Sequence, residues 1–98
     1  MHVNDLLKIA VDNGASDLHL KVGSFPMMRV RGSLIPVNRD ARLDHDEVVA
    51  MSAAIMSAAQ RQKFKEAQEV DLAYSVPGLG RFRVNVFHQR GSVGMVLR

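Results

Sequence analysis

The feature that most restricts the fold is a strict alternation of apolar and polar residues on both sides of one turn. Apolar side chains occupy every second position from Val70 to Val76, and Phe82, Val84 and Val86 repeat the pattern within residues 81–88. Successive side chains of a strand point to opposite sides, so each stretch predicts a half-buried strand. The segment 77–80 contains proline and two glycines and predicts the turn that leads from one strand into the next.

Helix signals surround this pair of strands. Asp44 with Glu47, and Ser57 with Gln60, have the spacing of capping boxes and predict two helix starts, the later helix running to about residue 67. Asn4 is expected to cap an earlier helix that stops at residues 13–14. The expected apolar face of the middle helix consists of Val48, Val49, Met51, Ala54 and Ile55. The other expected strands cover residues 16–22, 27–30, 34–37 and 93–97. This order predicts an α+β domain whose mostly antiparallel sheet is covered on one face by helices.

Length and composition indicate a single cytosolic domain. The 98 residues contain no cysteine, no repeat and no linker-like stretch, so residues 1–98 are treated as one unit. No apolar run approaches the roughly 18 residues that span a bilayer, and residues 1–5 do not resemble a signal peptide. The chain stops on a predicted strand without a cap or turn, so we expect the natural protein to continue beyond Arg98.

The sequence lacks the elements of an autonomous nucleotide hydrolase. It has no Gly-x-x-x-x-Gly-Lys-Ser/Thr loop to cradle phosphates, and no acidic cluster to hold magnesium beside them. Gly78 and Gly80 form a lone Gly-x-Gly that precedes a strand rather than a helix. We therefore expect no ATPase activity and no bound cofactor for this segment alone.

Arginines gather at the C-terminal end of the chain. Beyond Asp71 there is no acidic residue, while Arg81, Arg83, Arg90 and Arg98 all lie in this stretch, which contains no lysine. Arginine without lysine suggests planar recognition of phosphate or carboxylate. On the predicted strand, Arg81, Arg83 and Asn85 point away from the apolar face. The alternatives are a solvated face with cross-strand ion pairs to Asp71 or Glu69, or a nucleic-acid surface, which the scarcity of aromatic residues disfavours.

The histidines offer weaker candidates. Asp17 and His19 share one face of a predicted strand, where a structural hydrogen bond or simple solvation is favoured over a metal or acid–base pair. His88 lies on the apolar side of its strand and is expected to be buried. His2 and His45 have no partners at ligand spacing, so no metal site is predicted.

Two stretches resemble the signatures of the PilT-like pilus retraction ATPases, members of the secretion ATPase superfamily. They are residues 14–20, Gly-Ala-Ser-Asp-Leu-His-Leu, and residues 80–91, Gly-Arg-Phe-Arg-Val-Asn-Val-Phe-His-Gln-Arg-Gly. Residues 27–32 and 96–98 are also similar to that family. The resemblance implies a PAS-like N-terminal domain, followed beyond Arg98 by a RecA-like domain that binds ATP and Mg²⁺ and assembles into hexamers. Arg81, Arg83 and Arg98, and less strongly Arg90, are then the candidates for arginines that reach ATP across an interface.

The resemblance also implies a biological setting. The complete protein would be a cytoplasmic motor at the inner-membrane base of the pilus, powering retraction and twitching motility against a membrane platform, with no nucleic-acid partner. The alternatives are a pilus-extension or type II secretion ATPase of the same superfamily, and a free-standing PAS-like interaction module. Because Met1 directly precedes the first predicted helix, the retraction branch is favoured.

Overall fold

The computed structural model describes residues 2–98, which form three helices and one six-stranded sheet. The elements are α1 (Val3–Asp12), β1 (Asp17–Lys21), β2 (Met27–Val30), β3 (Ser33–Pro36), α2 (His45–Ile55), α3 (Ala58–Ala67), β4 (Glu69–Val76), β5 (Gly80–Gln89) and β6 (Ser92–Leu97). Every predicted element is present, and the bounds differ from the expected ones by one or two residues. No helix within residues 2–98 is long and apolar enough to cross a membrane.

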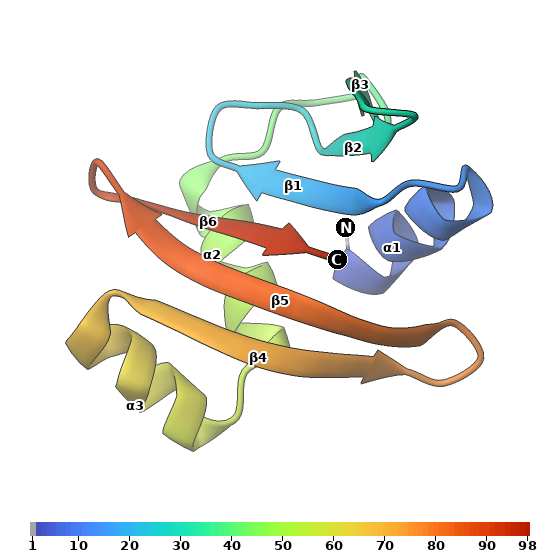
Figure 1. Cartoon of the computed structure of the whole chain (residues 1–98). Helices are drawn as coiled ribbons and strands as arrows, with labels where there is room; N and C mark the ends of the chain where they lie inside the picture. Colours follow the sequence, from blue (N-terminus) through green and yellow to red (C-terminus); the bar gives the residue numbers. More distant parts are fainter. Residues whose placement is uncertain (1) are drawn as a thin grey trace.

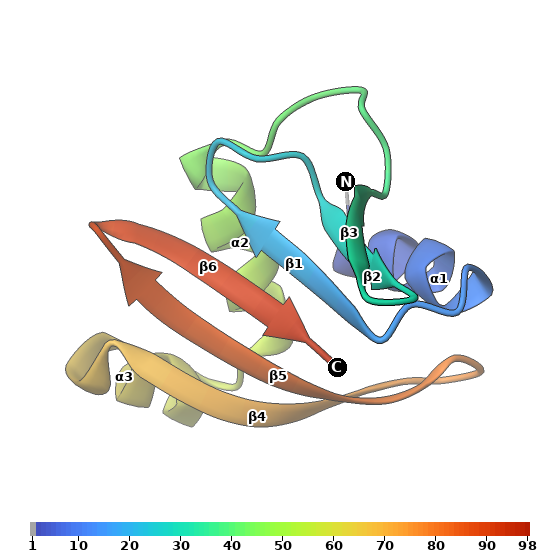
Figure 2. The same cartoon turned by 45° about the horizontal axis from the view of Figure 1, so that its top comes forward.

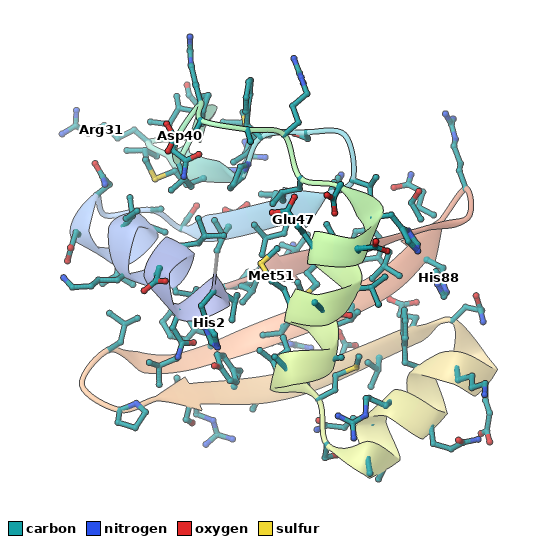
Figure 3. All side chains as sticks on the ribbon, turned by 180° about the vertical axis from the view of Figure 1, so that it is seen from behind. His2, Arg31, Asp40, Glu47, Met51 and His88 are labelled. Atoms are coloured by element: carbon teal, nitrogen blue, oxygen red, sulfur yellow. The ribbon has the colours of Figure 1, made fainter. Side chains whose placement is uncertain are left out.

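All strand pairs are antiparallel, and the sheet has the order β3-β2-β1-β6-β5-β4. The three helices lie behind the sheet in Figure 1 and in front of it in Figure 3, so they cover one face only. Figure 2 shows the short β2–β3 hairpin turned steeply against the longer strands. The predicted α+β class, with an antiparallel sheet covered on one face, is confirmed. No helix within residues 2–98 covers the opposite face, which we call the open face.

The core lies between the helices and the covered face of the sheet. Leu18 and Leu20 of β1 pack there with Val84 and Val86 of β5, and all four side chains are almost completely buried. Fully burying a side chain of this size contributes about 1.5–3 kcal/mol to folding. Since side chains alternate along each strand, burial of these residues forces their neighbours onto the open face.

Three details differ from the sequence-based expectations. The cap of α1 is His2, whose Nδ1 accepts a hydrogen bond from the Asn4 amide at 3.0 Å, so Asn4 is not the cap. The Asn4 side chain instead accepts a hydrogen bond from the Tyr74 hydroxyl at 2.5 Å, which joins α1 to β4. His88 is exposed rather than buried, because it lies where β5 runs past the end of the core. Its ring stacks on Phe64 with a centroid distance of 4.7 Å, and Figure 3 shows it beside α3.

The third difference concerns α2. Its buried residues are Val48, Met51, Ser52 and Ile55, whereas Val49 and Ala54 are exposed. The serine tolerates burial because its hydroxyl donates to the carbonyl of Val49 at 2.8 Å. Both predicted capping boxes, at Asp44 with Glu47 and at Ser57 with Gln60, are present.

Candidate functional site

Strand β5 places two of the candidate arginines on the open face. Phe82, Val84 and Val86 face the helices, so Arg81 and Arg83 project to the other side, where both are exposed. On the neighbouring strand β4, Ser75 pairs with Arg81 and Ala73 pairs with Arg83. These small partners leave the guanidinium groups uncovered.

The β5–β6 hairpin brings Arg98 directly beside Arg83. Their backbones exchange two hydrogen bonds, from Arg83 N to Arg98 O at 2.9 Å and from Arg98 N to Arg83 O at 2.8 Å. Residues that exchange both bonds in an antiparallel pair have Cα atoms about 5.5 Å apart and side chains on the same face. Two arginines therefore stand side by side at the end of β6.

A tight turn fixes this register. Gln89 pairs with Ser92, and only Arg90 and Gly91 lie between them, with φ angles of 53° and 78°. Two successive residues with positive φ are typical of the type I′ turn, whose twist suits a two-residue hairpin. A two-residue turn at 90–91 dictates that Arg83 lies opposite Arg98. Recognising this turn in the sequence would have predicted that the two arginines are neighbours, whereas the alternation of side chains along β5 does not.

Arg81, Arg83 and Arg98 together border an open hollow, which Asp71, Leu72, Ala73 and Phe82 also line. Arg90 is not part of this group. It occupies the turn at the far end of β5, about 23 Å from Arg83 at the usual rise per residue of a strand. The structure thus brings together three of the four candidate arginines and leaves Arg90 apart.

None of these four arginines forms an ion pair with a carboxylate of residues 2–98. The ion pairs to Asp71 or Glu69 that the solvated-face interpretation suggested are absent from this part of the chain. Both acids instead accept hydrogen bonds from Asn85 Nδ2, each at 2.9 Å. The sequence pattern gave no indication of this role of Asn85.

Asp17 and His19 lie further across the open face and form a compact polar cluster. His19 Nε2 is hydrogen-bonded to Asp17 Oδ2, Ser16 Oγ donates to Asp17 Oδ1 at 2.6 Å, and Arg29 Nε lies 3.5 Å from Asp17 Oδ2. Burial by itself raises the pKa of Asp17, but the hydrogen bonds from Ser16 and His19 and the charges of His19 and Arg29 outweigh it and lower the pKa. These contacts fit the structural interpretation of the pair. Across the described chain, no three His, Asp or Glu side chains come together in a way that could hold a metal ion.

The open face around Arg83 and Arg98 offers hydrogen-bond donors and positive charge. Guanidinium groups present planar sets of N–H donors that match carboxylate or phosphate oxygens. The arrangement supplies no nucleophile and no phosphate-cradling loop of its own. Such guanidinium donors could bind the oxygens of an anion.

Comparison with known proteins gave consistent relatives, although no protein-family model matches the chain. Over all 98 residues it is 43% identical to the type IV pilus retraction ATPase PilT of Pseudomonas aeruginosa and 40% identical to the type IV pilus ATPase PilU of the same organism. The chain spans only 28% and 25% of the length of these two relatives.

Solved structures agree with these relatives. The crystal structure of the pilus retraction motor PilT with bound ADP matches with a TM-score of 0.93 and 39% identity, covering all of this chain and 29% of that one. The ATPase DotB of Legionella pneumophila matches with a TM-score of 0.80 over 98% of this chain and 28% of its own, but at 23% identity it supports the fold alone.

Proposed function

Because the chain is homologous over its whole length to the N-terminal region of the pilus ATPases PilT and PilU, we propose that it is the N-terminal domain of a type IV pilus retraction ATPase. In this proposal a RecA-like domain follows Arg98, binds ATP with Mg²⁺, and assembles with neighbouring subunits into a hexamer. The complete motor works in the cytoplasm at the inner-membrane platform of the pilus. The 98-residue segment supplies contacts to that machinery and does not hydrolyse ATP by itself.

The observation that carries the proposal is the pairing of Arg83 with Arg98 on an open sheet face. We assign these two residues, together with Arg81, to the phosphates of ATP bound by a RecA-like domain across an interface. Negative charge builds up on the transferred phosphoryl group in the transition state, and a fixed arginine stabilises it. Two adjacent guanidinium groups that form no ion pair with any carboxylate of residues 2–98 are suited to that task.

A role in pilus extension or in type II secretion is the closest alternative, since such motors use the same superfamily of ATPases. Retraction is favoured because the PilT relative is itself named a retraction ATPase and is 43% identical over the whole chain. A free-standing interaction module is less consistent with these relatives, of which this chain spans only about a quarter.

A subunit-mixing experiment tests whether the arginines act across an interface. One variant of the complete ATPase carries Arg83→Ala, and a second carries an alanine in place of the lysine of its phosphate-binding loop. Each alone is expected to be inactive. In mixed rings, an intact Arg83 from one subunit meets an intact nucleotide site of its neighbour, so turnover should reappear.

The mixing ratio provides the control. Activity should rise and fall with the fraction of mixed interfaces, and mixing with a variant that carries both changes should restore nothing. If Arg83→Ala alone keeps normal turnover, the proposed role of Arg83 is wrong. If it is inactive and mixing restores no turnover at any ratio, action across a subunit interface is wrong.

A further inference from the structure

Asn85 lies between the arginine pair and the acids nearest to it. On the open face of β4, Glu69 and Asp71 are paired with Phe87 and Asn85 of β5, while Arg83 is paired with Ala73. The Asn85 amide nitrogen donates one hydrogen bond to Glu69 Oε1 and one to Asp71 Oδ1, both at 2.9 Å. A single neutral side chain therefore donates a hydrogen bond to each of two carboxylates.

Without that amide, Asp71 would be a natural partner for Arg83. The two residues are diagonal neighbours on adjacent strands, about 7–8 Å apart, a separation that long side chains bridge. Both side chains are exposed, yet no ion pair joins them among residues 2–98. The carboxylate that could neutralise Arg83 is directed to Asn85 instead.

The same situation occurs on the other side of the pair. Leu18 pairs with Leu97, so continuing the register places Asp17 next to Arg98. Asp17 is already held by Ser16, His19 and Arg29. Acids are thus present on both flanks of the arginine pair, and each is bound to other groups.

The absence of an ion pair between Arg83 and Asp71 leaves the folded chain less stable than it could be. Like charges placed directly opposite each other in a sheet are destabilising, and an ion pair to Asp71 would relieve part of the repulsion between Arg83 and Arg98. An amide is well suited to prevent that ion pair, since it offers two N–H donors to the acids and adds no charge.

We propose that Asn85 is a positioning residue that, with Glu69 as its second acceptor, keeps Asp71 from pairing with Arg83 and so leaves the Arg83–Arg98 pair open for an external anion. The identity of that anion as a nucleotide phosphate rests on the proposed function. The hydrogen bond from Asn85 to Asp71 does not, because it is a property of this chain alone.

A spectroscopic experiment on the 98-residue chain tests that property directly. In Asn85→Ala, Arg83 should pair with the released acids, which slows the solvent exchange of its Nε–H group and shifts its ¹⁵Nε resonance. Adding Glu69→Gln and Asp71→Asn to Asn85→Ala should reverse both changes. Asn85→Thr, which suits a strand and keeps a single donor, should give an intermediate shift. Arg83 signals that are the same in wild type, Asn85→Ala and Asn85→Thr would overturn the proposal.

Turnover by the complete ATPase tests the functional consequence. Because exposed ion pairs are weak, the competing acids should lower kcat/KM of Asn85→Ala by only about fivefold or less. This loss should shrink as salt is added and disappear in the variant that also carries Glu69→Gln and Asp71→Asn. Gln62→Ala is the matched control, since Gln62 makes the same kind of amide–carboxylate bond to Glu66 on α3 at 2.8 Å.

The outcomes separate this inference from the proposed function. A loss that persists after both acids are neutralised means that Asn85 acts directly, which overturns the inference while Arg83 keeps its role. Normal turnover of Arg83→Ala overturns the proposed role of Arg83, and the exchange of the Arg83 Nε–H group still decides whether Asn85 keeps Asp71 from pairing with it.

Discussion

Replacing Arg83 with alanine should leave the free energy of unfolding nearly unchanged but lower ATP turnover by about three orders of magnitude. The Arg83 side chain is exposed and points away from the core, and no ion pair involving it is present within residues 2–98. A surface change of this kind usually alters the free energy of unfolding by about 0.5 kcal/mol or less. Removing the charge also relieves repulsion from Arg98, worth about 0.8 kcal/mol for unit charges 5.5 Å apart in bulk water. The net change in folding free energy is therefore close to zero and of either sign.

The expected effect on the reaction is much larger. An arginine that stabilises the transferred phosphoryl group contributes about 10³-fold or more in turnover, which corresponds to about 4 kcal/mol of activation free energy. Arg83→Lys should not restore the rate, because an ammonium group lacks the planar fork of donors. Arg81→Ala should behave similarly if both arginines share one phosphate, and mildly if Arg81 only anchors the interface.

Two measurements on matched samples decide the question. Turnover at saturating ATP is measured in the complete ATPase, and thermal unfolding is measured in the 98-residue chain, where a change below 1 kcal/mol shifts Tm by less than about 8 °C. Arg39→Ala, an exposed arginine in the loop before α2, is the control and should alter neither. Normal turnover in a folded Arg83→Ala protein, or full activity of Arg83→Lys, would refute the reasoning.

Three further predictions concern the segment itself. Gly94→Ala would place a Cβ atom 2.8 and 2.9 Å from two ring atoms of Phe87, so the ring must move and the free energy of unfolding in urea should fall by about 1–3 kcal/mol. An added Phe87→Leu should recover part of this loss, and equal stability of Gly94→Ala and wild type would contradict the prediction. The pKa of Asp17 is lowered in the fold, so its carboxylate stabilises the fold above the unfolded-state pKa of about 4, and this contribution is lost as pH falls through the folded-state pKa. The stability advantage of wild type over Asp17→Asn should therefore shrink in acid. An advantage that does not change down to pH 2 would show that the carboxylate charge is not responsible. The isolated 98 residues should neither hydrolyse ATP nor bind it measurably at millimolar concentration, and micromolar affinity by calorimetry would overturn this expectation.

Local features of the fold were predictable because the interactions that define them are local. Both capping boxes involve residues three positions apart, and the faces of β4 and β5 follow from alternation along each strand. The α1 cap was assigned wrongly to Asn4 because a histidine two residues earlier provides the acceptor. Asparagine is the more usual cap. The hydrogen bond that the Asn4 side chain accepts from the Tyr74 hydroxyl comes from a strand seventy residues away, so the residues near Asn4 gave no sign of it.

Features that depend on where the core ends or on packing were harder to predict. The alternation of β5 correctly assigned His88 to the covered side, but alternation does not tell how far along a strand the helices extend. On α2, strict 3/4 spacing from Val48 leads to Ser52 rather than to Val49. Because serine is polar, this position was not recognised as buried. Apolarity alone therefore selected the wrong neighbour.

The candidate site was predictable one strand at a time. Parity placed Arg81 and Arg83 on the open face, but their proximity to Arg98 depends on the register of the β5–β6 hairpin. The hydrogen bonds of Asn85 to Glu69 and Asp71 depend in turn on the pairing of β4 with β5. Single-strand periodicity contains no information about such cross-strand partners.

The position of β6 has a consequence for how the chain folds. The last of the six strands, β6, lies in the middle of the sheet between β1 and β5, and its Leu97 pairs with Leu18 of β1. Before residues 92–97 are available, β1–β2–β3 and β4–β5 can form only as two separate pieces, each with an unpaired strand edge prone to aggregation. Joining them requires closure of a loop that includes most of the chain, an entropic cost that slows folding. The sheet can therefore become continuous only once β6 has paired with both β1 and β5.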